Sequence, residues 1–401
     1  MRFRIVCLFL LAAAVLRPQQ PNIEEIVKAM NPGEIQKGLA VWSQGPDVVF
    51  AVEADKEPLL RIDGEPAGRM EKLAGRNVWT YSTRLRQGTS HAFYYVIGGQ
   101  RFGGRQDVPV YLNDCYPKAD VPQGRLSEKM THTSKIYEGM VSDYWVYVPA
   151  QYDASRAAAL MVWQDGERHT RREGATKTLN VLDNLTHQKR IPVMISVFIS
   201  PGLAGQRRMR SIEYDTVNDA YARFLRDEIL TEALAKLNVR REGYSRGIEG
   251  QSSGAICALN VAWHMPDQFS RVLSHIGSYT SIQWRPGELE GGNVYPFKVR
   301  KEPKRNIRIW LQDGSEDLEN NHGSWPLQNI QLANSLKMRA YDFHLSWSNG
   351  SHSGAHGSAE LPRSLTWLWR DYDPAKTEQV YEMDPAEKTK PMFRVKTLNR
   401  E

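Results

Sequence analysis

The pentapeptide Gly250-Gln251-Ser252-Ser253-Gly254 constrains the local fold more than any other stretch of the chain. Its G-x-S-x-G pattern is typical of a sharp turn from a strand into a helix, with a serine hydroxyl held clear of the sheet by strained backbone. The flanking glycines are needed because side chains there would collide with the neighbouring strand and helix. The helix N-terminus behind the serine supplies a backbone N–H group and a positive dipole end, which together can stabilise an oxyanion.

A second copy of the pattern, Gly243-Tyr244-Ser245-Arg246-Gly247, lies just before the first. Ser245 follows a polar and charged run, and no helix follows it. Ser252 instead precedes residues 253–264, a segment rich in small residues that predicts a helix ending near Pro266. We therefore predict Ser252 as a nucleophile and Ser245 as a loop residue.

Residues 1–16 have the pattern of a secretory signal peptide. Arg2 and Arg4 form a basic start, residues 5–16 are apolar, and three consecutive alanines at 12–14 offer a cleavage site. The alternative is a buried N-terminal helix. The signal predicts export to the periplasm or the medium, and no later segment is apolar for long enough to span a membrane.

The formal net charge of +6 is spread over the whole chain, and no basic run is interleaved with stacking aromatic residues. This pattern argues against nucleic-acid binding. Two cysteines follow the signal segment. Cys257 lies in the predicted helix after Ser252 and Cys115 in a predicted linker, so we expect two free thiols and not a disulfide.

Residues 38–116 contain only short strand patterns separated by turn residues, after one possible helix at 23–30. They predict a small β-sandwich of immunoglobulin-like type. Its aromatic side chains suit either a sugar-stacking face or, as is more common, core packing across strands: Trp79, Tyr81, Phe93, Tyr94 and Tyr95.

Residues 117–127 are a predicted linker, and from residue 128 to 373 strand and helix patterns alternate. Apolar, β-branched strands between helices predict a mainly parallel sheet with helices on both faces. One long amphipathic helix is expected over residues 215–237. Residues 374–401 are charged, and we expect a loosely ordered tail.

A serine hydroxyl needs an imidazole to accept its proton and a carboxylate to orient that imidazole. On a sheet with this turn the acid and then the histidine follow the serine along the chain, each in a loop after a later strand. The loop Asp313-Gly314-Ser315-Glu316-Asp317 follows a predicted strand at 307–312. Asp317 is the favoured acid because it lies far enough along to reach a histidine, and Asp313 is the alternative.

Residues 349–357, after a predicted strand at 342–348, form a Gly/Ser-rich loop with two histidines. His352 comes first after the strand and is the favoured base, with His356 as the alternative. The H-x-x-x-H spacing would suit a metal only on a helix, and the glycines around it argue against one. No metal and no cofactor are expected.

The oxyanion site should combine the N–H group of Ser253 with one from the loop after the predicted strand at 157–163. That loop reads Gln164-Asp165-Gly166-Glu167. The donor there is Gly166 or Glu167, because the glycine lets the backbone approach a substrate.

Several of these segments occur together, and in the same order, in one known family. They are the Ser252 turn, the 164–166 loop, residues 311–318, and Gly350-Ser351-His352 followed by residues 361–369. In these segments the chain resembles the esterase D-like family of α/β-hydrolases, and within it the enterochelin esterase-like branch. That branch also carries a β-sandwich before its catalytic domain, so the resemblance extends over residues 38–373.

The resemblance implies the α/β-hydrolase fold and the catalytic residues Ser252, Asp317 and His352. It also implies an Arg210–Glu213 pair that shapes the rim of the substrate pocket, with a solvated ion pair as the alternative. Gln251 and His356 are further candidates for binding the substrate, and His356 could instead cap the helix that follows. The family cleaves siderophore, feruloyl, acetyl and thioester substrates.

We therefore predict an exported serine esterase without a cofactor, acting on small or polysaccharide-linked esters. A serine peptidase or acyltransferase with the same residues, or a non-catalytic carbohydrate-binding envelope protein, are the alternatives.

Overall fold

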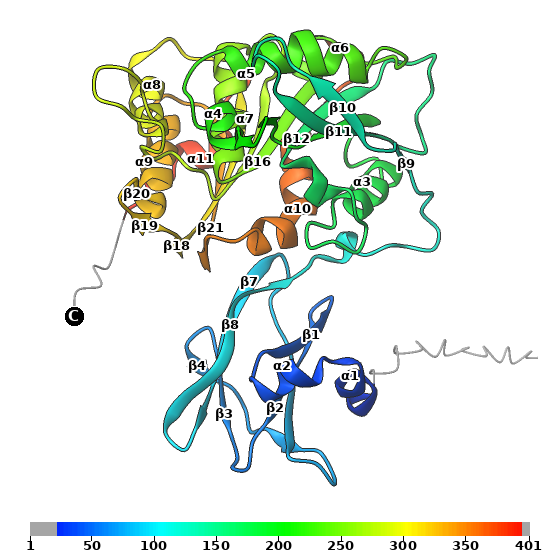
Figure 1. Ribbon diagram of the computed structural model, residues 1–401, viewed down its shortest axis with the longest axis vertical. Coiled ribbons are helices and arrows are strands. Elements are labelled where there is room, and N and C mark those ends of the chain that lie inside the picture. Colours follow the sequence, from blue (N-terminus) through cyan, green and yellow to red (C-terminus); the bar gives the residue numbers. More distant parts are fainter. Residues whose placement is uncertain (1–21, 395–401) are drawn as a thin grey trace, which may run out of the picture.

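The computed structural model describes residues 22–394, which fold into a smaller β region and a larger α/β region (Figure 1). The two regions meet where the last long helix packs against two strands of the β region. Within residues 22–394, no helix has the length and apolar character needed to cross a lipid bilayer.

The β region consists of two four-stranded antiparallel sheets behind two short helices. Its core lies between the sheets and includes Phe50, Phe93 and Tyr95, so two of the five candidate stacking rings are core residues. The immunoglobulin-like strand order stays a prediction. The elements are α1 (Ile23–Ala29), α2 (Pro32–Gln36), one sheet of β1 (Ala40–Gln44), β2 (Asp47–Glu53), β6 (Val78–Arg84) and β5 (Glu71–Lys72), and a second of β4 (Glu65–Pro66), β3 (Leu59–Ile62), β7 (Thr89–Ile97) and β8 (Gln100–Val110).

The connection between the regions is bound to the helix α3 (Thr178–His187) by hydrogen bonds. The side-chain amide of Asn184 donates to the carbonyl oxygens of Asp114 and Tyr116, at 2.9 and 2.8 Å. The Gly124 N–H group donates to the Asp183 carboxylate at 2.7 Å. The segment predicted as a linker is therefore bound to α3 just before it begins and again at Gly124.

The α/β region is built on an 11-stranded sheet in which the central strands run parallel. This confirms the mainly parallel sheet. In spatial order its strands are β15 (Arg207–Arg208), β14 (Leu203–Ala204), β11 (Val141–Val148), β13 (Met194–Ile199), β12 (Ala159–Gln164), β16 (Arg246–Gln251), β17 (Arg271–His275), β18 (Arg308–Glu316) and β21 (Asp342–Ser351), with β9 (Arg125–Leu126) and β10 (Met130–Thr133) on β11.

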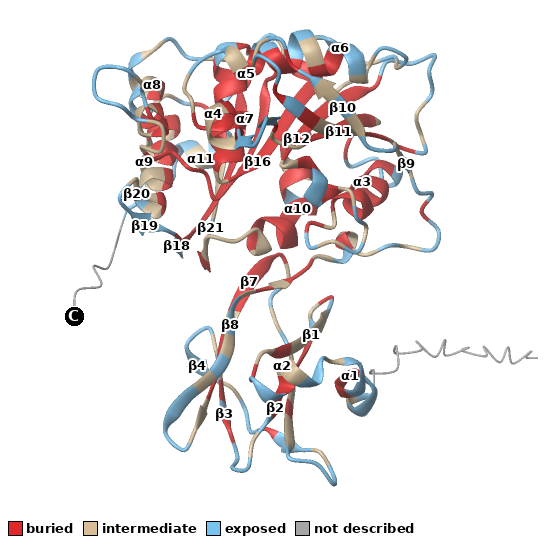
Figure 2. Cartoon of the chain, viewed as in Figure 1, coloured by how far each residue is buried: buried red, intermediate tan, exposed pale blue. Residues whose placement is uncertain are grey.

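Side chains alternate between the two faces of the sheet along each strand. Apolar side chains therefore lie on both faces, and helices cover both. On β12, Val162 packs into the cluster that contains Leu332, whereas its neighbour Trp163 packs with Leu182 and Leu365. Figure 2 shows the resulting buried centre. The helices are α3 and α10 (Ala355–Leu368) on one face, and α4 (Arg210–Tyr214), α5 (Ala220–Arg223), α6 (Leu230–Ala233), α7 (Ser253–His264), α8 (Tyr295–Lys301) and α9 (Trp325–Met338) on the other.

The long helix expected over residues 215–237 is wrong in its extent. Helix α4 ends before Asp215, whose carboxylate accepts a hydrogen bond from Ser211 at 2.7 Å. The next helical turns begin at Ala220 and pass through a π-helix, Phe224–Ile229, before α6. The π-turn lets both ends of this segment, Phe224 and Ile229, reach the core.

The loosely ordered tail is also wrong for the part of it that lies within the described residues. Tyr381 and Met383 are buried, and the short helix α11 (Pro385–Lys388) follows them. The Tyr381 hydroxyl lies 2.9 Å from Ser270 Oγ, and its ring lies 4.7 Å from the Arg308 guanidinium carbon. The charged tail is therefore held to the α/β region by its buried side chains, Tyr381 and Met383.

Candidate active site

The turn between β16 and α7 places Ser252 in a left-handed backbone conformation, with φ 58° and ψ −122°. Such a conformation is rare for a residue with a side chain and marks a strained site. Gly250 makes the turn possible, because a Cβ atom on it would lie 2.0 Å from the carbonyl oxygen of Gly254. Ser252 thus stands at the carboxyl edge of the parallel sheet.

His352 lies directly after β21, at the same edge as Ser252. Its Nε2 atom is 2.8 Å from Ser252 Oγ, and its Nδ1 atom is 2.5 Å from Asp317 Oδ1. The contacts place a proton acceptor against the serine hydroxyl and a carboxylate against the far ring nitrogen, as general-base activation of a serine requires.

Asp317 has the environment of a carboxylate that stays ionised. Burial alone would raise the pKa of Asp317. The hydrogen bond and charge of His352, the neighbouring Asp313 and the Leu318 N–H group together outweigh burial and lower that pKa below the ordinary range. The Leu318 N–H group also donates to Asp317 Oδ1 at 2.5 Å. The alternative acid, Asp313, instead accepts from the Gly314 N–H group at 2.9 Å.

The alternative base, His356, lies in the first turn of α10 and is buried. Its Nδ1 atom is 2.9 Å from Ser348 Oγ and 3.2 Å from the Gln312 side-chain nitrogen. The Gln251 side chain is also buried, beneath Gly354 of the histidine loop. Both residues therefore support the loop from behind and do not face the Ser252 hydroxyl.

Two backbone segments border the serine where an oxyanion would form. Ser253 is the first residue of α7. Across from it, β12 ends in a left-handed Asp165 (φ 52°) and the 3-10 helix Gly166–His169. The Glu167 N–H group donates to Ser200 Oγ at 3.2 Å, an uncharged acceptor that an oxyanion would outcompete.

Arg210 links these two segments, and the expected Arg210–Glu213 pair is wrong. Its Nε and Nη2 atoms each lie 2.7 Å from an oxygen of Asp165, and Nη2 also donates to the Gln251 carbonyl at 3.4 Å. Glu213 is buried and accepts from the Gly202 N–H group at 2.8 Å; burial raises its pKa to about 7. Because α4 is little more than one turn, Arg210 at its start reaches back to β12 while Glu213 points toward the loop after β13.

Comparison with known proteins gives this geometry a family. The model of the family described as "Putative esterase" matches residues 142–368, more than half of the chain. The chain belongs to this family. It is a carboxylic ester hydrolase, and the family match spans the strands and loops that carry Ser252, Asp317 and His352.

A relative of known activity supports the assignment to the enterochelin esterase-like branch, and two solved structures share the fold. The iron(III) enterobactin esterase of Escherichia coli K12 is 26% identical over 296 residues, covering 61% of this chain and 69% of that protein. Among solved structures, the ferric enterobactin esterase of Salmonella typhimurium has a TM-score of 0.55 at 17% identity, covering 82% of this chain and 96% of that one. A ferulic acid esterase has a TM-score of 0.50 at 18% identity, covering 63% of this chain and all of that one. The structural likenesses show a shared fold.

Two residues beside Ser252 were not predicted from the sequence. Ser278 Oγ lies 3.1 Å from Ser252 Oγ, and the indole N–H of Trp325 donates to Ser278 Oγ at 3.1 Å. The Trp325 ring stands edge-on to His352, with 5.6 Å between centroids. Position was the available signal for Ser278, since it lies just after β17 at the carboxyl edge of the sheet.

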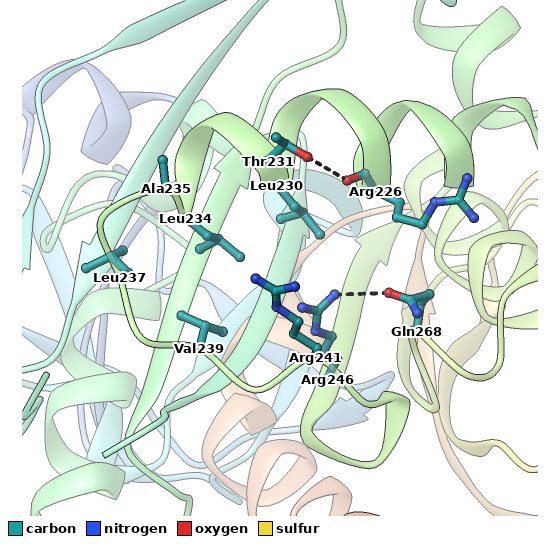
Figure 3. A pocket seen from close by; sticks show the side chains of 10 residues that line it. All are labelled: Arg226, Leu230, Thr231, Leu234, Ala235, Leu237, Val239, Arg241, Arg246 and Gln268. Atoms are coloured by element: carbon teal, nitrogen blue, oxygen red, sulfur yellow. Dashed lines mark hydrogen bonds between the residues drawn. The ribbon is translucent and has the colours of Figure 1, made fainter. Parts of the chain in front are cut away.

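The esterase also has a cavity of about 570 Å³ that is separate from this site (Figure 3). It opens beside Arg246, the first residue of β16, whereas Ser252 follows the last residue of that strand. The cavity therefore lies at the opposite end of the strand and is not where an ester meets the nucleophile. Its lining joins the side chains of Arg226, Leu230, Thr231, Leu234, Ala235, Leu237, Val239, Arg241, Arg246 and Gln268.

Proposed function

We propose that this enzyme hydrolyses esters through a Ser252–His352–Asp317 triad and an acyl-enzyme. The observation that carries the proposal is the unbroken chain of contacts from Ser252 Oγ through both ring nitrogens of His352 to Asp317. No cofactor is needed for this chemistry.

In the first half of the reaction, His352 Nε2 accepts the hydroxyl proton as Ser252 Oγ attacks the ester carbonyl carbon. Asp317 stabilises the imidazolium that forms. The negative charge on the carbonyl oxygen is held by the N–H group of Ser253 together with that of Gly166 or Glu167. His352 then returns the proton to the departing alcohol, which leaves Ser252 acylated.

In the second half, water takes the place of the alcohol. His352 accepts a proton from the water, whose oxygen attacks the acyl carbon. The resulting tetrahedral species collapses to release the acid, and His352 gives its proton to the departing Ser252 Oγ, which restores the hydroxyl and the neutral imidazole. The same backbone N–H groups stabilise both tetrahedral species, so one oxyanion site serves the whole cycle.

The proposed substrates are aromatic or carbohydrate-linked esters. The relatives named as esterases of iron(III) enterobactin and of ferulic acid support this proposal. The Trp325 ring beside His352 also offers an apolar wall close to the reacting atoms. Export to the periplasm or the medium is proposed from residues 1–16, which lie outside the described residues.

The test compares Ser252→Ala with Ser245→Ala on 4-nitrophenyl acetate. Ser252→Ala should abolish turnover and block labelling by a fluorophosphonate probe. Ser245→Ala should retain turnover, because Ser245 Oγ is bonded to Glu242 at 2.7 Å on the cavity side of β16. Full activity of Ser252→Ala would overturn the proposal. Separately, the substrates of the wild-type enzyme can be ranked on a panel of feruloyl, acetylxylan, glucuronoyl and catecholate trilactone esters.

A further inference from the structure

The β region reaches into the histidine loop of the α/β region through Asp107. Asp107 lies in β8 where the pairing with β7 slips: His91 pairs with Val108, but Phe93 pairs with Arg105. At this bulge Asp107 adopts a left-handed conformation, φ 60°. Bulges of this kind re-aim a side chain away from the regular face of a strand, and they are frequent beside active sites.

The re-aimed carboxylate binds Ser351, the residue that immediately precedes His352. The Ser351 N–H group donates to Asp107 Oδ1 at 2.9 Å, and the Ser351 hydroxyl donates to Asp107 Oδ2. Ser90 Oγ of β7 lies 3.4 Å from Asp107 Oδ1 and supports the carboxylate from within the β region. Both oxygens of Asp107 therefore hold one residue of the loop.

A second carboxylate of the β region, that of Asp63, lies near the same segment, beside Asn349. Asp63 lies 2.6 Å from His91 Nδ1 and accepts from the Ala92 N–H group at 2.9 Å. Burial would raise the pKa of Asp63, but these bonds, with one from the Asn349 side chain, lower it, so it remains a charged acceptor. Gly350, the residue before Ser351, packs closely against the β region: a Cβ atom there would lie 3.3 Å from both Asp107 Oδ1 and Ser90 Oγ.

The same residues are held from the other side by the α/β region. A Cβ atom on Gly314, in β18, would lie 2.2 Å from the carbonyl oxygen of Gly350, in β21. The end of β21 thus lies between β18 and the β region. Its pairing with β18 is irregular here, with Ser351 opposite Glu316 after a register shift, so the contacts from the β region add to this pairing in deciding where His352 points.

We propose that Asp107 is a positioning residue for His352, so that the β region sets the orientation of the catalytic base. The inference rests on the proposed function, in which His352 is that base. Asp107 touches neither the nucleophile nor the substrate site, and it acts by fixing the backbone of Ser351. Small displacements of a catalytic group can lower rates by about 100-fold.

The experiment measures kcat and KM of the full chain carrying Asp107→Ala, on 4-nitrophenyl acetate and a feruloyl ester. We expect kcat to fall about 10- to 100-fold while KM stays within about twofold, because only the base is misplaced. Fluorophosphonate labelling of Ser252 should slow in the same ratio. Asp107→Asn, which still accepts from the Ser351 N–H group, should recover part of the loss.

The matched control is Asp47→Ala, which removes another β-region carboxylate, one that is exposed and 3.6 Å from Arg84. It should leave kcat at the wild-type value. A folded Asp107→Ala enzyme with wild-type kcat, or a loss that appears in KM alone, would overturn the inference. If Asp107→Ala fails to fold, Ser351→Ala carries the test: it removes one of the two bonds and should lower kcat about three- to tenfold, and wild-type kcat would refute positioning.

Ser252→Ala in the same assay separates the two proposals. An active Ser252→Ala enzyme would contradict the triad itself, whatever Asp107→Ala does. An inactive Ser252→Ala enzyme beside a fully active Asp107→Ala enzyme would leave the triad in place and remove only the role of the β region.

Discussion

The carboxyl groups of Asp313 and Asp317 interact closely, and their pKa values are shifted in opposite directions. Burial, reinforced by the neighbouring Asp317, raises the pKa of Asp313 well above its usual range. The bond to His352 lowers the pKa of Asp317 against the effect of burial. Of the two, Asp313 therefore holds a proton more readily, and Asp317 is the carboxylate that faces the imidazole.

This division predicts different results for the two asparagine variants. Asp317→Asn should lower kcat by about 10³- to 10⁴-fold, because the amide favours the wrong imidazole tautomer and cannot balance an imidazolium. Asp313→Asn should keep kcat at pH 7 within about threefold, since an amide N–H replaces a carboxyl O–H toward Asp317. Steady-state rates on 4-nitrophenyl acetate check both predictions. A greater loss of kcat in Asp313→Asn than in Asp317→Asn would show that Asp313, and not Asp317, orients the histidine.

Asp313→Asn should also change how stability depends on pH. In the unfolded chain Asp313 loses its proton above pH ~4, whereas in the folded state its raised pKa keeps the proton bound to a higher pH. Between these two pKa values, the contribution of Asp313 to the stability of the wild type falls as the pH rises. Asparagine does not titrate. The free energy of unfolding of Asp313→Asn, relative to wild type, should therefore increase from pH 5 to pH 8, as urea unfolding would measure. An unchanged difference between the two pH values would contradict the raised pKa.

Substitution by alanine should have different effects at His352 and at His356. His352→Ala removes the proton acceptor and should lower kcat at least about 10³-fold with little loss of stability. His356→Ala leaves Ser348 and Gln312 without their buried partner, which should lower the free energy of unfolding by about 1–3 kcal/mol and kcat by less than about tenfold. Rates and urea midpoints of the two variants, measured together, would reveal an exchanged assignment.

Arg210→Lys should impair catalysis without removing the charge. A lysine cannot reproduce the two parallel hydrogen bonds to Asp165. These bonds hold the 164–167 loop beside the Ser252 turn, so we expect kcat to fall about tenfold. The control is Arg223→Lys, which alters an exposed pair with Asp219 and should keep kcat within about twofold. Equal rates in the two lysine variants would show that the Asp165 link does not support the reaction.

The sequence predicts most accurately what is decided locally or by strand order. The helix after the nucleophile has the predicted bounds, Ser253–His264, because small residues, an N-terminal turn and a following proline act together there. The strands before the acid and the histidine are longer than predicted, since β18 runs to Glu316 and β21 to Ser351. Asp317 and His352 still follow them directly, because the carboxyl ends of parallel strands meet at one edge of a sheet. The structure brings Ser252, Asp317 and His352 together at that edge.

Contacts between distant segments could not be predicted in this way. Arg210 finds Asp165, 45 residues away, because β12 ends in a left-handed turn that no local pattern indicates. Asp107 meets Ser351 across 244 residues because of a bulge in β8, and Tyr381 is buried by arginines from two central strands. In each case, backbone irregularity or long-range packing decides the partner.

The connection that lies along α3 has a thermodynamic consequence. It is bonded to α3 through Asn184 and Asp183, and the Leu112 N–H group just before it donates to the Ala359 carbonyl of α10 at 3.2 Å. A flexible tether would let the two regions melt independently, whereas this one breaks only when the α/β core opens. The chain should therefore lose both regions in one cooperative transition, with a calorimetric enthalpy equal to the van't Hoff enthalpy.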